Sequence, residues 1–319
     1  MNNFSAKENE VSPGLTIVGK WNARSYTLIR QLGEGVTGVV YLAQSIDGKV
    51  AIKFGLDQMS IAQEVNVLKE LSKVQEIRLG PYLHDVDDYQ ATPMSRVIPY
   101  YVMEYIQGVD FLRFMSGKGS EWLSVVIIQL LTQLQQLHER DWIFGDLKPE
   151  NIIVTKNASQ VRLLDVGGTT KKDRAIKEYT ELYDRGYWVG GSRKAEVSYD
   201  LFSVAILMIH CAYPSQLKKE SHKPLEQLKK QIERSEQLKP FKSIILGALQ
   251  GQYQSAENMK NELLHLKSTK KTSYSSAEIN TSRMTRIKKQ RQKHAITDLI
   301  FLIAFVGLLI ILYLLVSKF

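Results

Sequence analysis

The stretch that decides the fold is Asp146-Leu147-Lys148-Pro149-Glu150-Asn151, which the short apolar run Ile152–Thr155 follows. Three of its side chains have separate chemical uses. Asp146 can accept the proton of an attacking hydroxyl, Lys148 can neutralise a transferring phosphoryl group, and Asn151 can bind a metal ion. Because three such groups occur together at short spacing, the string is specific, and it indicates phosphoryl transfer.

Downstream, Leu163-Leu164-Asp165-Val166-Gly167 places an aspartate at the end of an apolar strand, with a glycine soon after it. A carboxylate in that position can chelate Mg²⁺, which prefers a carboxylate, an amide oxygen, phosphates and waters. Asp165 and Asn151 are therefore the predicted metal ligands.

Upstream, Gly33-Glu34-Gly35-Val36-Thr37-Gly38-Val39-Val40 is a glycine-rich stretch between two expected strands. Glycines let the backbone approach phosphate oxygens without a side chain in the way. Because the stretch joins two strands and not a strand and a helix, the pattern disfavours a dinucleotide-binding fold. It favours a lid over a nucleotide, with Val40 against the base.

A lysine ends the next expected strand, Val50-Ala51-Ile52-Lys53. Its ammonium group can reach nucleotide phosphates, although an isolated strand-end lysine is usually only solvated. Glu64 follows on a helix whose other face is apolar, so we expect it to hold Lys53 in an ion pair.

The periodicity of the chain predicts a strand-rich half followed by a helix-rich half. The expected strands are Tyr26–Leu32, Val39–Ala43, Val50–Phe54 and Pro99–Tyr105, and the expected helices are Ser60–Lys73, Glu121–Arg140 and Leu201–Cys211. The last two helices are apolar on most of their circumference, which is typical of buried helices. Cys211 is the single cysteine, so no disulfide framework and no cysteine-based zinc site can form.

These motifs, in this order, resemble the Hanks-type (eukaryotic-like) protein kinases over residues 25 to about 267. The resemblance implies an α+β, bilobal protein-kinase fold. It has a small β-rich N-lobe over residues 25–103, a hinge over 104–108 and a larger α-helical C-lobe over 109–267. It also implies ATP and Mg²⁺ as cofactors and proteins as substrates, with serine and threonine preferred over tyrosine because Lys148 matches the serine/threonine pattern.

The resemblance further implies roles for single residues. Asp146 is the catalytic base, Lys148 stabilises the transferring phosphate, Asn151 and Asp165 hold Mg²⁺, and Asp200 supports the catalytic loop. The residues that it assigns to ATP, including the helix glutamate that pairs with the lysine, are Leu32, Gly33, Gly35, Gly38, Val40, Ala51, Lys53, Glu64, Met103, Glu104 and Ile106.

The chain departs from the family pattern in three places. Phe144-Gly145 stands where the family usually has His-Arg, so the arginine that grips a loop phosphate is missing, and Val166 replaces a phenylalanine. We therefore expect activity not to depend strongly on loop phosphorylation. In the family, the glutamate of an Ala-Pro-Glu motif forms a buried ion pair with an arginine. Here no Ala-Pro-Glu precedes Asp200, and the arginine is also absent near Gln252, so we expect both members of that ion pair to be lost together. This leaves the segment that the resemblance implies for substrate docking, roughly residues 175–199, without a confident alignment.

The two ends of the chain differ from the central domain. Residues 1–24 read as a polar leader. Residues 268–294 read as a basic juxtamembrane linker, and with Lys267 they carry nine Lys or Arg and one acid, hence +8 of the total net charge of +9. The 18 residues of Leu299–Val316 are apolar or weakly polar and predict a transmembrane helix over 295–317. The positive-inside rule then predicts a cell-membrane protein with a cytoplasmic kinase domain.

This tail-anchored layout resembles the YabT-type kinases of spore-forming bacteria. The basic run 283–293 predicts contact with anionic lipid, and DNA is a second candidate ligand there. Two other functions stay open. A pseudokinase scaffold would need a missing catalytic group, and a small-molecule kinase of the aminoglycoside or sugar class would share the lobes and Gly145 but not Lys148. The oligomeric state, the protein targets and the activating signal have no signature in the sequence.

Overall fold

The computed structural model describes residues 11–72, 79–156, 159–220 and 222–266, which lie almost entirely in one compact unit ending at Leu264. The predicted basic linker at 268–294, the predicted transmembrane helix at 295–317 and the first ten residues of the leader lie outside these ranges. Within the described residues, no helix is both long enough and apolar enough to cross a membrane.

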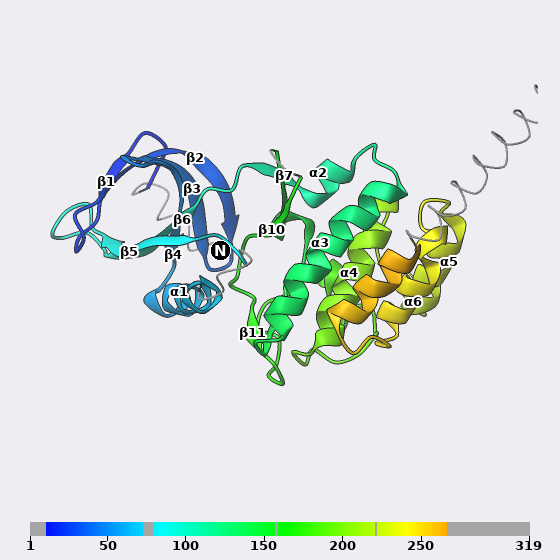
Figure 1. Cartoon of the computed structure of the whole chain (residues 1–319). Helices are drawn as coiled ribbons and strands as arrows, with labels where there is room; N and C mark the ends of the chain where they lie inside the picture. The colour runs from blue at the N-terminus through cyan, green and yellow to red at the C-terminus, as the bar shows by residue number, and fades with distance from the viewer. Residues whose placement is uncertain (1–10, 73–78, 157–158, 221, 267–319) are drawn as a thin grey trace, which may run out of the picture. The chain divides into compact units, whose positions relative to one another are not determined.

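A six-stranded antiparallel sheet with the order β1-β2-β3-β4-β6-β5 forms the N-lobe (Figure 1). Side chains alternate between its two faces. One face buries Val39, Tyr41, Ile52 and Phe54 in a common apolar core, and the other faces the cleft. The strands are β1 Thr16–Val18, β2 Ser25–Gly35, β3 Gly38–Ser45, β4 Gly48–Gly55, β5 Leu83–Tyr89 and β6 Ile98–Glu104.

The N-lobe begins earlier than the sequence predicted. Strand β1 lies within the expected leader, pairs with β2 in the register Ile17↔Tyr26, and buries Ile17 completely. Val11 is also buried, against the same core. The predicted boundary between residues 24 and 25 is therefore wrong. The sequence did not reveal β1, because three residues are too few to produce the periodic pattern that identifies a strand.

Helix α1, Gln58–Ser72, covers one face of the sheet in Figure 1. Ile61, Val65 and Leu68 recur at helical spacing and form its buried side. Glu64 falls on the same side and is 3% exposed. The helix therefore carries one carboxylate into the protein interior, where only a cation can compensate for its burial.

The C-lobe is mostly helical and is built around α4, Val197–Ala212, in which every residue from Tyr199 to His210 is buried. Helix α3, Ser120–His138, packs against α4, and α6, Lys242–Leu249, covers it from another side (Figure 1). The other elements are β7 Gly108–Asp110, α2 Phe111–Met115, β8 Trp142–Ile143, η1 Pro149–Asn151, β9 Ile152–Thr155, β10 Val161–Leu163, β11 Thr170–Lys171, η2 Glu181–Tyr183, α5 Pro224–Arg234 and η3 Lys239–Phe241, and residues 256–266 are also helical.

The bilobal α+β prediction is confirmed, and each expected strand and helix is present within a few residues of its predicted ends. The hinge follows β6 directly. The two small sheets of the C-lobe, β10-β9-β7 and β11-β8, flank the loop that contains residues 144–148. The 3.6 Å contact of Lys53 Nζ with Asp165 Oδ1 brings β4 of the N-lobe close to the segment that follows β10.

Candidate active site

The carboxylate of Asp146 is held from two sides. Lys148 Nζ lies 2.6 Å from Asp146 Oδ2, and the Thr180 hydroxyl donates to Asp146 Oδ1 at 2.8 Å. Asn151 Nδ2 donates to the Asp146 carbonyl at 2.9 Å, which fixes the turn between the two residues. Thr180 was not among the predicted site residues, since it comes from the segment that no motif aligned.

Asp200 supports the catalytic loop that contains Asp146, as the sequence predicted. It is fully buried in the first turn of α4, and its carboxylate accepts hydrogen bonds from the backbone amides of Phe144 and Gly145, each at 2.9 Å. His138 Nε2 contacts the same carboxylate at 2.8 Å. Three partners at one carboxylate tie the end of α3, the catalytic loop and α4 together.

The expected ion pair of the N-lobe is present, with Lys53 Nζ 2.7 Å from Glu64 Oε2. The Tyr101 hydroxyl donates to the same oxygen at 2.8 Å. Burial alone would lower the pKa of Lys53, but the carboxylates of Asp165 and Glu64 outweigh burial and raise it. Lys53 therefore stays cationic. It also lies 3.6 Å from Asp165 Oδ1, so it connects the two lobes across the cleft.

The residues that would hold Mg²⁺ fit such an ion. The Nδ2 group of Asn151 donates to the Asp146 carbonyl, which leaves the Asn151 Oδ1 for a ligand. The Asp165 side chain is about half exposed in the cleft. No group of three or more His, Cys, Asp or Glu side chains in the described ranges could bind a metal by itself. Two protein ligands are what Mg²⁺ uses when nucleotide phosphates and waters complete its shell.

The predicted nucleotide residues line one face of the N-lobe sheet. In the antiparallel register Val40 stands opposite Lys53, and Ala51 stands opposite Met103, so these four side chains share the face turned to the cleft. Gly33, Gly35 and Gly38 lie in the β2–β3 hairpin, with the half-buried Leu32 beside them. A Cβ at Gly38 would meet the Phe54 carbonyl at 2.1 Å, so no other residue fits there.

An arginine that the sequence did not indicate braces the hinge. Arg162 in β10 forms two hydrogen bonds with the Glu104 carboxylate, at 2.9 and 3.3 Å, and a third with the Gly80 carbonyl at 2.7 Å. The Glu104 side chain thus points to Arg162, and its backbone amide donates to the Tyr82 carbonyl at 2.8 Å. The predicted contacts of the Glu104 and Ile106 backbone with adenine stay a prediction.

Segment 175–199 contains a second buried aspartate, Asp184. Its carboxylate accepts from the amides of Gly186 and Tyr187, from the Tyr199 hydroxyl and twice from Arg193. Burial alone would raise its pKa, but the Arg193 hydrogen bonds and the other donors lower it.

Segment 175–199 contains an ion pair of its own, which differs from the Ala-Pro-Glu pair that the sequence lacks. Arg185 Nη2 lies 2.7 Å from Glu196 Oε1, and the Arg185 side chain is 7% exposed. Its guanidinium also donates to the Ser192 carbonyl at 2.7 and 3.0 Å. Both members of this pair come from the same segment, so the pair closes the segment on itself.

Glu178 is a further acid near the site. Its burial raises its pKa, and the carboxylate charges of Asp165, Glu64 and Asp146 act in the same direction, against Lys53. Glu178 is therefore close enough to these carboxylates for their charges to raise its pKa.

A fold of two such lobes, with this cleft between them, is the fold of kinases. The model of the protein kinase domain matches residues 26–283, and the chain therefore belongs to the protein kinase family. The prediction of a serine/threonine protein kinase is confirmed at the level of family and enzyme class, and members of this class generally use ATP and Mg²⁺.

Known relatives agree with this assignment. The chain is 51% identical over 254 residues to the serine/threonine-protein kinase YabT of Bacillus subtilis, covering 80% of this chain and 75% of that protein. The resemblance to the YabT type is thus confirmed. It is 27% identical over 205 residues to the serine/threonine-protein kinase sid1 of Schizosaccharomyces pombe, covering 60% of this chain and 41% of that one. The crystal structure of the Mycobacterium tuberculosis PknI kinase domain, as a double mutant, superposes with a TM-score of 0.56 at 17% identity, covering 80% and 99% of the two chains, which supports the fold.

Proposed function

We propose that this protein transfers the γ-phosphate of ATP to serine and threonine hydroxyls of cytoplasmic proteins. In the transfer, the substrate oxygen forms a bond to the γ-phosphorus while the bond to the β–γ bridging oxygen breaks, ADP leaves, and Asp146 accepts the hydroxyl proton. Lys148 compensates for the charge of the phosphoryl oxygens. Bound Mg²⁺ would neutralise phosphate charge next to Asn151 and Asp165.

The contact between Thr180 and Asp146 carries the proposal most directly. An aliphatic hydroxyl from the segment beside the cleft donates to the carboxylate of the proposed base at 2.8 Å. The hydroxyl of a substrate serine or threonine has the same chemistry as that of Thr180 and lies at a similar distance from its own backbone. The contact therefore supports an aliphatic acceptor over the longer phenol of tyrosine.

Labelled ATP tests this function. The full-length protein is incubated with γ-labelled ATP, Mg²⁺ and a generic protein substrate such as casein, and the labelled amino acids are separated after hydrolysis. We expect phosphoserine and phosphothreonine, with Asp146→Asn as the inactive control. Phosphotyrosine alone, or transfer to an aminoglycoside but to no protein, would contradict the proposal.

We also propose that the chain is anchored in the cell membrane by residues 295–317, with the kinase domain in the cytoplasm. The support is the apolar run of 18 residues with basic residues crowded before it. Deletion of residues 295–319 should release the protein to the soluble fraction, and protease added to intact cells should leave the kinase domain uncut. A full-length protein in the soluble fraction would contradict this.

The basic run 283–293 supports binding of polyanions next to the anchor. We propose that it binds anionic lipid and DNA, and that this binding regulates the kinase. The chain shortened to residues 1–294 is compared with the chain shortened to 1–267 by titration with duplex DNA at several salt concentrations and with anionic vesicles. Binding should be independent of DNA sequence, weaken steeply with salt and disappear in the shorter chain. Equal affinity of the two chains would contradict the assignment.

A further inference from the structure

Two neighbouring tyrosines of β6, Tyr100 and Tyr101, lie on opposite faces of the N-lobe sheet. Tyr101 stands opposite Lys53 of β4 in the antiparallel register, so both side chains belong to the face that is turned to the cleft. Tyr100 belongs to the apolar core on the other face. Tyr101 is 2% exposed and Tyr100 is 0% exposed, so the two residues differ in their surroundings and not in their burial.

The hydroxyl groups of the two tyrosines differ in their partners. The Tyr101 hydroxyl donates to Glu64 Oε2 at 2.8 Å. The Tyr100 hydroxyl has no hydrogen-bond partner among the residues that the structure describes. A hydrogen bond to a carboxylate is charge-assisted and is stronger than one between neutral groups. The two hydroxyls therefore form a natural pair for comparison, because only that of Tyr101 holds a charged group.

The ammonium group of Lys53 is shared between several negative groups. Its Nζ lies 2.8 Å from Glu64 Oε1, 2.7 Å from Glu64 Oε2 and 3.6 Å from Asp165 Oδ1. An ammonium group has three donors. In the proposed transfer, the phosphates of ATP need the same donors. Each donor that turns to a phosphate therefore leaves Glu64 less well held by Lys53.

The Tyr101 hydroxyl is a donor that stays with Glu64. Its pKa is raised well above the ordinary value of 10, first by burial and then by the charges of Glu64 and Asp165. The group therefore keeps its proton and remains a neutral donor. Because the tyrosine ring is enclosed between the sheet and α1, its hydrogen bond to Glu64 persists when Lys53 turns toward ATP.

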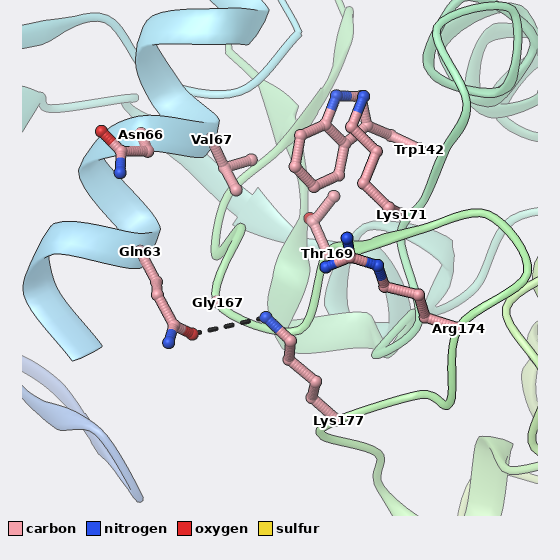
Figure 2. A pocket seen from close by; sticks show the side chains of 9 residues that line it. All are labelled: Gln63, Asn66, Val67, Trp142, Gly167, Thr169, Lys171, Arg174 and Lys177. Carbon is pink, nitrogen blue, oxygen red and sulfur yellow. Dashed lines mark hydrogen bonds between the residues drawn. The ribbon is translucent and has the colours of Figure 1, made fainter. Parts of the chain in front are cut away.

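Helix α1 is loosely packed toward the stretch that follows Asp165. A cavity of about 170 Å³ lies between α1 and residues 167–177 (Figure 2). The hydrogen bond that Figure 2 marks across this cavity joins Lys177 Nζ to Gln63 Oε1 at 3.4 Å, between two long exposed side chains. The shorter and buried contact of this turn of α1 is the one from Tyr101 to Glu64.

We propose that Tyr101 is a positioning residue for phosphoryl transfer, whose hydroxyl keeps Glu64 in place while Lys53 binds the phosphates of ATP. The inference rests on the proposed function, because ATP is the ligand for which Lys53 leaves part of its contact with Glu64. Tyr101 acts through Glu64, to which its hydroxyl is bound. Loss of that hydroxyl should therefore weaken the binding of ATP and leave the binding of a protein substrate unchanged.

A pair of substitutions isolates the hydroxyl group. Tyr101→Phe removes the donor to Glu64, and Tyr100→Phe is the matched control, because it removes the same group from the next residue at similar burial. Steady-state rates of the full-length variants with casein give the KM values for ATP and for the protein. We expect Tyr101→Phe to raise the KM for ATP by about fivefold or more and to leave the KM for casein unchanged. Tyr100→Phe should change neither value.

Binding of a non-hydrolysable ATP analogue with Mg²⁺ is measured without any transfer. Thermal unfolding of each full-length variant against the analogue concentration gives the affinity, and the sample without analogue gives the stability of the free protein. We expect Tyr101→Phe to bind the analogue about fivefold or more weakly than Tyr100→Phe. A tyrosine that only stabilises the fold would lower the stability of the free protein and leave the affinity unchanged, and this outcome would overturn the proposal.

The binding experiment also separates this proposal from the proposed function. If the wild type transferred phosphate to no protein, the proposed function would fail, while the analogue affinities would still decide the role of Tyr101.

A double-mutant cycle then tests whether Tyr101 acts through Glu64. Glu64→Gln removes the charged acceptor, so Tyr101→Phe added to it should change the analogue affinity by less than about twofold. In the wild-type background the same substitution should give the full loss. Equal losses in the two backgrounds would show that Tyr101 acts by another route, and they would overturn the proposal.

Discussion

Asp200 and Asp184 are both fully buried aspartates that collect several hydrogen bonds, yet they serve different regions of the C-lobe. Asp200 lies in α4, and its partners Phe144, Gly145 and His138 lie more than 50 residues away along the chain. The partners of Asp184 all lie within 15 residues, and they include the charged Arg193. The first aspartate joins distant elements, and the second closes one segment on itself.

The difference predicts separate roles: Asp200 acts on the catalytic loop, and Asp184 acts on the shape of residues 184–199, which belong to the predicted substrate-docking segment. Asp200 fixes the loop that contains Asp146, so its loss displaces the reacting groups. Asp184 holds residues 184–199 together, so we expect its loss to alter the fit of a protein substrate. We therefore expect changes around Asp200 to lower kcat, and changes around Asp184 to raise KM and lower stability.

The largest effect is expected at the catalytic loop itself. Asp146→Asn should lower kcat by roughly a thousandfold, because the base that accepts the substrate proton is lost. Asp141→Asn is the matched control, since Asp141 is an exposed aspartate of the same stretch. Steady-state rates of the two full-length variants with a protein substrate make the measurement. Comparable rates would remove Asp146 from the mechanism.

The anchor of that loop should matter next. Asp200→Asn replaces one acceptor by a donor against the amides of Phe144 and Gly145, so the loop must shift. A small displacement of reacting groups can lower kcat by roughly a hundredfold. The KM for ATP should change little, because no nucleotide residue touches Asp200. A variant with unchanged kcat would show that α3 and η1 hold the loop without this carboxylate.

Asp184→Asn should act mainly on stability. The charge-assisted hydrogen bonds to Arg193 are lost, which costs about 2 kcal/mol of unfolding free energy. Urea titration makes the measurement, and the KM for a protein substrate should rise while kcat stays close to that of the wild type.

The pH dependence provides the control for Asp184. Its pKa in the folded protein lies below the ordinary 3.8, so its contribution is complete above that value and is lost as the pH falls through the lower folded pKa. The stability difference between wild type and Asp184→Asn should therefore be constant near neutral pH and shrink below about pH 4. A difference that persists at lower pH would assign the effect to packing and not to charge.

Thr180 lies where the two regions meet, and a pair of substitutions distinguishes its hydroxyl from its shape. Thr180→Val should lower kcat by roughly tenfold, since Asp146 loses a hydrogen bond that orients it. Thr180→Ser keeps the hydroxyl and should stay close to the wild type. If serine were as impaired as valine, the γ-methyl group would be the important part of Thr180.

The smallest effect is expected at the ion pair of Arg185. Glu196 is about 38% exposed, and water screens the pair, so Glu196→Gln should cost under about 1 kcal/mol. Arg185 keeps its hydrogen bonds to the Ser192 carbonyl. Arg185→Gln breaks those as well and should cost more in the same urea titration. Equal costs would mean that the charge pair and not the carbonyl holds Arg185.

The sequence predicts the catalytic loop and the N-lobe well because their signals are local. Asp146, Lys148 and Asn151 lie within six residues, and the Lys53–Glu64 pair spans 11. Each strand of the glycine-rich hairpin has a periodic pattern and a turn. Such features need no knowledge of distant contacts, and a resemblance to known kinases then supplies the roles.

The missed features depend on pairing that no short pattern encodes. The three residues of β1 become a strand only because β2 offers an edge, and Arg162 reaches Glu104 across 58 residues. Asp184 and Arg185 lie in a loop whose hydrogen bonds are irregular. The sequence around a buried loop aspartate does not differ from the sequence around an exposed one, so only the folded surroundings reveal its role.

Gly145 restricts which residues can occupy the start of the catalytic loop. Its φ is +83°, and a Cβ there would meet the Gly168 carbonyl at 2.8 Å. The arginine that resembling kinases carry at this position therefore cannot be restored by one substitution, because the backbone of two segments has closed over the space that it would need. An arginine at position 145 would therefore fit only if the Gly168 backbone moved away from it.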